Sequence, residues 1–200
     1  MNKLLIATSN RGKIEQIKPV LEDLPLELVF LPDLKLNLEA EENGKTLEEN
    51  ALIKANFYSG LTGLWTLSDD MGMEIDALGG EPGVKSRRWP GHEASDEELI
   101  QLTLDKLKGV PFKERKASFK SVIAIAGPKK ENWILQGVSR GYISENPSQI
   151  KIKGLPFACL FFIPEYKKIF TELTDKEKER AGHRIKALKK AKKIIKEILC

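Results

Sequence analysis

The spacing of apolar residues predicts strands and helices that alternate along the whole chain. Short apolar or alternating runs are typical of strands, and they occur at Lys3–Ala7, Leu26–Leu31, Leu64–Ser68, Lys116–Ala126, Asn132–Ser139, Gly141–Ser144 and Leu160–Ile163. Apolar positions at helical spacing predict helices at 14–21, from Thr46 to about Ser59, from Ser95 to about Lys108, from Thr174 to Gly182, and over the last residues of the chain. The chain is therefore expected to fold as an α/β protein.

Polar residues mark where several of these helices begin. A hydroxyl residue and a glutamate three positions later have the spacing of a capping box, as at Thr46 and Glu49, Ser95 and Glu98, and Thr174 and Glu177. Pro19 lies inside the first helical pattern, and we expect that helix to kink or break near it.

Composition narrows the class of protein. The chain has 200 residues, of which 41% are hydrophobic and 31% charged, so it is long enough for one domain with a sizeable core. No run approaches the roughly 20 apolar residues of a membrane-spanning helix, and the amino-terminal apolar stretch is too short for a secretory signal. Two cysteines are too few for a disulfide scaffold. We expect a cytoplasmic protein without a membrane partner.

Positive charge is concentrated at the carboxyl terminus. The whole chain carries 33 − 29 = +4, whereas His183–Cys200 carries 7 − 1 = +6, which leaves 4 − 6 = −2 for the rest. Leu188, Ala191, Ile195 and Ile198 form an apolar stripe in this segment, so we expect a helix docked by that stripe with its lysines in solvent. We expect no nucleic-acid partner, and a nucleic-acid-binding module that uses this helix stays open as an alternative.

A polar turn after the first predicted strand is the first candidate site. Hydroxyl, amide, backbone N–H and cationic groups gather there ahead of a helix, in the residues Thr8, Ser9, Asn10, Arg11, Gly12 and Lys13. Such groups at a helix amino terminus suit a phosphate, although the glycine spacing is not that of a Walker A loop. An ordinary capped turn explains the same residues.

Acidic residues form the second candidate site. Asp69 and Asp70 follow a buried strand, where neighbouring carboxylates repel each other unless a metal or hydrogen bonds offset the charge. Mg²⁺ suits such a pair because it binds through a few carboxylates and leaves positions for water and phosphate. Glu41 and Glu42 offer another carboxylate to the same metal, and a solvated acidic turn is the alternative for both pairs.

Motifs in a fixed order give the chain a family resemblance. They are the turn 8–13 (TSNRGK), residues 41–51 (EENGKTLEENA), 68–70 (SDD), 76–84 (DALGGEPGV), 86–88 (SRR), 161–166 (FFIPEY), Glu172, Leu173, Lys178 and 183–188 (HRIKAL). This order resembles the inosine triphosphate pyrophosphatase family over nearly the whole chain.

The resemblance implies a fold and an assembly. It implies a long mixed β-sheet flanked by helices, which forms two lobes with a central nucleotide cleft within a single domain over residues 1–200. It also implies a homodimer.

The resemblance further implies a reaction. It implies Mg²⁺-dependent hydrolysis of nucleoside triphosphates such as ITP, dITP and XTP to the monophosphate and pyrophosphate. A catalytically weakened relative that still binds nucleotides is the alternative.

The same resemblance implies roles for individual residues. Asp70 takes the role of general base and metal ligand, and Glu41 that of a second metal ligand. The turn residues Thr8 to Lys13 hold the phosphates with help from Lys54. The residues implied to contact the base or to close the site are Met71, Lys178, His183 and Arg184.

Departures from the family pattern cluster on the base side. Met71 replaces a serine, and Gly182 replaces the serine ahead of His183. The family's Gly-Phe-Gly-Tyr-Asp-Pro reads Gly154-Leu155-Pro156-Phe157-Ala158-Cys159 here, which removes a stacking ring and a carboxylate. We therefore expect retained triphosphate chemistry with altered or relaxed base choice.

Overall fold

The computed structural model describes residues 2–34, 36 and 38–200, and the chain divides into two compact units. Unit 1 consists of Met1–Met71, Ser121–Gly137 and His183–Cys200, and unit 2 of Gly72–Lys120 and Val138–Gly182. Three long strands run from one unit into the other, so each unit is built from segments distant in sequence.

The described residues form one eight-stranded sheet. Its strands are β1 (Lys3–Ile6), β2 (Glu27–Phe30), β3 (Trp65–Ile75), β4 (Pro82–Gly83), β5 (Lys116–Ala126), β6 (Asn132–Ile143), β7 (Phe161–Ile163) and β8 (Lys168–Ile169). The strand order is β2-β1-β3-β5-β6-β7-β8, and β4 pairs with β3. Strand β1 is parallel to both β2 and β3, whereas β3 with β4, β6 with β7 and β7 with β8 are antiparallel. The predicted mixed sheet flanked by helices is confirmed.

Five α-helices complete the described fold: α1 (Arg11–Leu21), α2 (Leu47–Thr62), α3 (Asp96–Lys106), α4 (Asp175–Ala181) and α5 (His183–Leu199). Side-chain oxygens of the predicted capping residues Thr46, Ser95 and Thr174 accept hydrogen bonds from backbone N–H groups three positions on. Helix α1 continues through Pro19 and ends two residues later. Proline has no N–H, so it removes one backbone hydrogen bond to the preceding turn, and only two residues of the helix follow Pro19.

Two strand predictions were wrong in extent. Strand β3 does not end at Ser68 but continues to Ile75, because buried Met73 and Ile75 extend its apolar pattern. Asp69 and Asp70 therefore lie in the middle of a strand. The two strands expected at 132–144 are one strand, β6. Gly141 does not interrupt it, because the missing side chain leaves room for the backbone carbonyl of Phe162 on the neighbouring β7.

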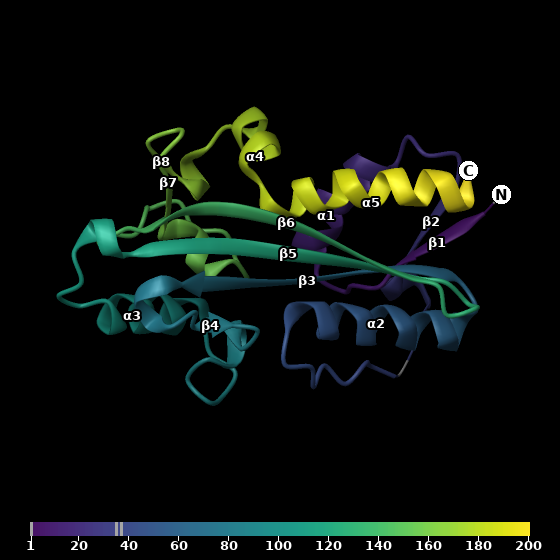
Figure 1. The fold of residues 1–200 in the computed structure, drawn as a ribbon, viewed down its shortest axis with the longest axis horizontal. Helices are drawn as coiled ribbons and strands as arrows, with labels where there is room; N and C mark the ends of the chain where they lie inside the picture. The colour runs from purple at the N-terminus through teal and green to yellow at the C-terminus, as the bar shows by residue number, and fades with distance from the viewer. Residues whose placement is uncertain (1, 35, 37) are drawn as a thin grey trace. The chain divides into compact units, whose positions relative to one another are not determined.

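Unit 1 has helices on both faces of its part of the sheet (Figure 1). Helices α1 and α5 lie side by side on one face, where Ile17, Leu188 and Ile195 share a core with Leu4 and Leu67. The predicted apolar stripe of the terminal helix is therefore part of this core. Helix α2 covers the other face, with Tyr58 packed near Leu5 and Ala7.

A glycine sets how closely helix α5 approaches the sheet. A Cβ at Gly137 of β6 would collide with the carbonyl oxygen of His183 and come close to the backbone nitrogen of Ala187. Only a residue without a side chain allows this contact. Gly137 thus positions the first turn of α5, which carries His183 and Arg184.

Unit 2 has a separate aromatic core. Phe119 packs edge-on against Phe161 with ring centroids 4.9 Å apart, and Trp89 packs against Phe157 at 6.3 Å. Phe157 belongs to a buried 3₁₀ turn, Pro156–Cys159. The segment in which this sequence departs most from the family pattern is therefore largely inside the core of unit 2.

Candidate functional site

The polar turn lies at the carboxyl end of β1. The parallel pairing of β1 with β3 ends at Ile6 and Leu67, and the N–H of Ala7 donates to the carbonyl of Leu67 at 2.8 Å. The chain then turns into α1, where the Asn10 side chain accepts from the N–H of Lys13 at 3.1 Å. The turn at the carboxyl end of β1 is thereby placed beside the middle of β3, where Lys13 reaches Asp69. The carboxyl ends of strands are where open α/β sheets bind ligands.

A cavity of about 380 Å³ opens beside this turn. It lies within unit 1 and is of a size that holds a small molecule. The predicted residues that line it are Thr8, Ser9, Asn10, Lys13 and Lys54, together with Glu42. Polar groups from the turn after β1, from α1, from the loop before α2 and from α2 itself therefore face one space.

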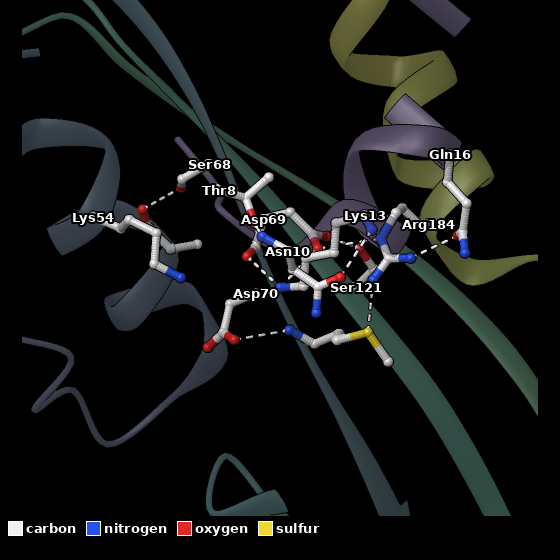
Figure 2. Close-up of polar contacts among 12 residues, drawn as sticks. Thr8, Asn10, Lys13, Gln16, Lys54, Ser68, Asp69, Asp70, Ser121 and Arg184 are labelled. Carbon is white, nitrogen blue, oxygen red and sulfur yellow. Dashed lines mark hydrogen bonds and ion pairs between the residues drawn. The ribbon is translucent and has the colours of Figure 1, made fainter. Parts of the chain in front are cut away.

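Asp69 is completely enclosed by donors (Figure 2). Its Oδ2 contacts Nζ of Lys13 at 3.1 Å and Nε of Arg184 at 3.2 Å, while its Oδ1 accepts from the Ser121 hydroxyl at 2.6 Å. Burial opposes ionisation, but the two cations and Ser121 outweigh it and hold the pKa of Asp69 well below its usual range. Its oxygens are therefore occupied by the protein itself.

Asp70, the next residue, has a different environment. Its carboxylate accepts from the N–H of Met71 at 2.9 Å, and burial raises its pKa, helped by the charge of Glu42. Lys13 and Lys54 act in the opposite direction without cancelling the rise. A carboxylate of this kind binds protons or cations more readily than Asp69 does. The two neighbouring aspartates thus differ in their surroundings, which shift their pKa values in opposite directions.

Glu42, not Glu41, lies at the cavity. Glu42 forms an ion pair of 2.9 Å with Lys54, whereas Glu41 is exposed and absent from the cavity lining. The loop that carries Glu42 is held against α2, because the N–H of Gly44 donates to the Asn50 side chain at 2.7 Å and a Cβ at Gly44 would crowd that side chain. The resemblance gave the role of second metal ligand to Glu41, whereas the cavity lining contains Glu42.

Arg184 is buried, with its side chain only 3% exposed, and three side chains orient it (Figure 2). In addition to the Asp69 contact of Nε, its Nη1 donates to Gln16 at 2.6 Å and its Nη2 to the sulfur of Met71 at 2.7 Å. We call Lys13, Gln16, Asp69, Ser121 and Arg184 the Asp69 cluster. Through it, α1, β3, β5 and α5 are joined by polar contacts within unit 1.

His183 is also buried at the start of α5. Burial lowers its pKa to about 3, and the neighbouring charge of Arg184 adds to the effect. The imidazole is therefore neutral at pH 7 and does not change its charge near neutrality. Its expected ability to exchange protons near neutral pH does not fit this environment.

Eight of the predicted residues are not among those that line the cavity, namely Arg11, Gly12, Glu41, Asp70, Met71, Lys178, His183 and Arg184. Arg11 and Gly12 are exposed in the first turn of α1, and Lys178 is half-buried on α4 in unit 2. Sequence reasoning missed Ser121 and Gln16, which have no motif of their own. Gln16 lies one turn after the polar turn, on the helix that the turn opens, and that position was the only available signal.

The carboxylates of Asp70 and Glu42 fit a magnesium ion. Both are hard oxygen donors, and Mg²⁺ takes one or two carboxylates while water and phosphate oxygens fill its remaining positions. Within residues 2–34, 36 and 38–200, no group of three or more His, Cys, Asp and Glu residues gathers around one point. The residues therefore suit a metal that arrives together with a phosphate ligand.

The structure also bears on membrane association. Across the part of the chain that the structure describes, no helix combines the length and apolar character needed to cross a bilayer.

Comparison with known proteins agrees with the motifs. The model of the Ham1 family matches residues 4–194. The chain is 38% identical to a dITP/XTP pyrophosphatase of Clostridium perfringens over the full length of both proteins, and 40% identical to one of Geobacter sulfurreducens over 94% of each. A HAM1 protein structure from Coxiella burnetii superimposes with a TM-score of 0.89 at 33% identity, covering 98% of this chain and 100% of that one. This chain therefore belongs to the Ham1 family, which confirms the resemblance found in its motifs.

Proposed function

We propose that this chain is a Mg²⁺-dependent hydrolase that cleaves deaminated purine nucleoside triphosphates such as dITP, ITP and XTP to the monophosphate and pyrophosphate. The curated relatives named dITP/XTP pyrophosphatase support this reaction. The observation that carries the proposal is the contrast between the two aspartates at the phosphate-type turn. Asp69 is occupied by protein donors, while Asp70 is a partly buried carboxylate with a raised pKa beside Lys13 and Lys54.

The cations and the turn would bind the triphosphate. Lys13 and Lys54 present ammonium groups beside the cavity, and the start of α1 offers backbone N–H groups next to Thr8 and Asn10. Lys54 is now paired with Glu42, and a phosphate would compete for it. These groups stabilise the charge that accumulates on the leaving pyrophosphate.

Asp70 would supply the base. Hydrolysis adds one water across a phosphoanhydride bond, and the attacking water must lose a proton as its oxygen bonds to phosphorus. A carboxylate with a raised pKa accepts that proton more readily than an ordinary aspartate. Mg²⁺ held by Asp70 and Glu42 would neutralise triphosphate charge. Asp69 would instead hold Lys13 and Arg184 in place.

Base recognition is proposed to differ from the usual family pattern. Arg184 and Met71 lie together, and His183 and Lys178 complete the residues that the resemblance places near the base. The departures at 154–159 remove a ring and a carboxylate that a base-reading site could use. A homodimeric assembly belongs to the proposal through the resemblance, and a cytoplasmic location through the hydropathy pattern of the sequence.

The test is pyrophosphate release with Mg²⁺ from ITP, XTP, dITP, GTP, ATP and pyrimidine triphosphates. Asp70→Asn keeps the side-chain volume and removes the base, so release is expected to fall by roughly 10² to 10⁴-fold. Asp105→Asn, on the exposed surface of α3 in unit 2, is the matched control and should retain full activity. Activity that persists in Asp70→Asn would move the base elsewhere.

Complete silence of the wild-type protein would contradict the proposed reaction. It would favour the catalytically weakened, nucleotide-binding relative, which equilibrium binding of ITP then tests. The nucleic-acid alternative would use the lysine face of α5, since its apolar stripe belongs to the core of unit 1, and salt-sensitive binding of DNA or RNA tests it.

A further inference from the structure

Ser121 is a polar residue in an apolar part of strand β5. The residues from Ser121 to Ala126 are all fully buried, and the others in this run are valine, isoleucine or alanine. A hydroxyl without a hydrogen-bond partner is costly in such surroundings. Its partner is Asp69 on the neighbouring strand β3, whose Oδ1 accepts the hydrogen bond at 2.6 Å. The Ser121 hydroxyl is therefore committed to a carboxylate and not to the backbone.

The hydrogen bond from Ser121 limits how the Asp69 carboxylate is turned (Figure 2). Rotation of an aspartate carboxylate about its last side-chain bond is a soft motion. With Oδ1 held by Ser121, it is Oδ2 that contacts both cations, Nζ of Lys13 at 3.1 Å and Nε of Arg184 at 3.2 Å. Without the hydroxyl, Oδ1 becomes a second acceptor, and the two cations no longer share one oxygen. The position of each cation then changes.

Lys13 is the cation of this pair that lines the cavity. Its ammonium has three N–H donors. One donates to the backbone carbonyl of Asp69 at 2.9 Å and a second faces the Asp69 carboxylate, which leaves one for a ligand in the cavity. The Lys13 side chain is 17% exposed, whereas buried Arg184 is absent from the described cavity lining. A change at the Asp69 carboxylate therefore reaches the cavity through Lys13.

We propose that Ser121 is a positioning residue for phosphate binding: by fixing the carboxylate of Asp69, its hydroxyl holds the ammonium of Lys13 with one N–H directed at a phosphate oxygen. The inference rests on the proposed function in taking a phosphate as the ligand of the turn that Lys13 ends. Ser121 does not touch that ligand, since it is fully buried and absent from the described cavity lining. It acts through two other residues, Asp69 and Lys13.

Two substitutions at position 121 separate the hydroxyl from the packing around it. Ser121→Ala removes the donor, so the Kd for imidodiphosphate, a pyrophosphate analogue that is not hydrolysed, should rise about 3- to 10-fold in the presence of Mg²⁺. Ser121→Thr keeps the hydroxyl and adds a methyl group to a close-packed core, so it should lower the free energy of unfolding but leave Kd within about twofold of wild type. Isothermal titration calorimetry measures Kd, and urea denaturation measures the free energy of unfolding. A loss of affinity in Ser121→Thr as large as in Ser121→Ala overturns the proposal, since packing would then explain both.

Ser59→Ala is the matched control. Ser59 is 2% exposed, lies on α2 in unit 1, and donates its hydroxyl hydrogen bond to the backbone carbonyl of Leu64 at 2.8 Å. This substitution removes the same group from a comparably buried site without touching the Asp69 cluster, so Kd for imidodiphosphate should stay within about twofold of wild type. An equal rise of Kd in both alanine variants overturns the proposal, because loss of any buried hydroxyl would then weaken binding.

A double-mutant cycle determines whether the effect passes through Lys13. Lys13→Met keeps the apolar stem and removes the ammonium, so by itself it should raise Kd for imidodiphosphate about 10- to 100-fold. In the Lys13→Met protein, a further Ser121→Ala change should alter Kd by less than about twofold. A rise as large as the one that Ser121→Ala causes alone overturns the proposal, since Ser121 would then act without Lys13.

Failure of this inference and failure of the proposed reaction have different signatures. If wild type binds imidodiphosphate but cleaves no nucleotide, the reaction is contradicted, and the Kd comparisons still decide the role of Ser121. If wild type does not bind imidodiphosphate, the turn takes no phosphate and the proposal for Ser121 is overturned. If Ser121→Ala does not fold, Ser121→Cys supplies a weak donor instead and should raise Kd by more than Ser121→Thr does. The reverse order overturns the proposal.

Discussion

The Asp69 cluster in unit 1 and the segment Gly154–Cys159 in unit 2 are stabilised by different interactions between their buried side chains. In the cluster, one carboxylate is matched by two cations and a hydroxyl. In the segment, Pro156 to Cys159 are buried with apolar or weakly polar side chains packed into an aromatic core. The first arrangement fixes the positions of two cations, Lys13 and Arg184. The second buries its side chains by apolar packing, so the two regions are stabilised by different kinds of contact.

The largest effect is expected when the charge matching of the cluster is broken. Asp69→Asn leaves Lys13 and Arg184 without their shared counter-charge, so the free energy of unfolding should fall by about 3–5 kcal/mol. Urea denaturation measures this change. Asp70→Asn is the adjacent control and should change the free energy of unfolding by less than about 1 kcal/mol, because burial already disfavours that charge. Equal losses in both variants would erase the distinction between the two aspartates.

A smaller loss is expected from the backbone contact that places Arg184. Gly137→Ala drives a Cβ into the carbonyl of His183, so the free energy of unfolding should fall by about 1–3 kcal/mol and nucleotide affinity should weaken. The matched control is Gly60→Ala, which lies exposed within α2 with open space around its Cβ position. That change should stabilise the protein by about 0.5–1 kcal/mol, since alanine favours helix. A neutral Gly137→Ala would show that α5 can shift without cost.

Sequence patterns predicted the mixed α/β class and most of the helices. Thr8 to Lys13 could be placed at a helix start because a short apolar run precedes them, and Thr46 revealed its helix through capping chemistry. The pattern did not show that β3 runs past Asp69 and Asp70, because two charged residues interrupt an apolar run in the same way that a turn does. The sequence also does not show that the charge of Asp69 is balanced, because its partners Lys13 and Arg184 are distant in sequence and meet it only in the fold.

The contacts of individual site residues could not be predicted from the sequence either, because they also depend on segments that are distant in the chain. Glu41 and Glu42 are neighbouring residues of the same type, so the sequence alone does not distinguish them. In the fold it is Glu42 that lines the cavity, on a loop that the hydrogen bond between Gly44 and Asn50 holds against α2. Ser121 lies in β5 among alternating residues, and nothing in that alternation singles out one serine as a partner of Asp69. Local pattern predicts elements well, whereas contacts between segments distant in sequence depend on how those elements pack.

A pH effect of intermediate size should report on the buried end of α5. The pKa of His183 is lowered in the folded protein from 6.5 to about 3, so below pH 6.5 the unfolded chain binds a proton that the folded protein does not. The free energy of unfolding should therefore decrease as pH falls below 6.5, by at most about 1.4 kcal/mol per pH unit from this group. Urea denaturation at pH 7.5, 6 and 5 measures the slope.

The variant His183→Gln isolates this contribution. It removes the titrating group and should flatten the slope between pH 6.5 and about 5, above the range in which the lowered pKa of Asp69 contributes. An unchanged slope would assign the acid sensitivity to other groups.

The smallest expected energy difference bears most directly on selectivity. If the apolar segment at 154–159 has relaxed base choice, kcat/KM for ITP and ATP should differ by no more than about tenfold, or roughly 1.4 kcal/mol. Half-buried Leu155 allows a sharper test, because Leu155→Phe restores an aromatic face. This variant should raise purine affinity about 2- to 10-fold and leave the ratio of kcat/KM for ITP to that for ATP unchanged. Stacking does not distinguish a carbonyl from an amino group, whereas hydrogen bonding does. A wild-type preference for ITP of a thousandfold would contradict relaxation, and it would place discrimination with Arg184 in unit 1 and not with the segment that changed.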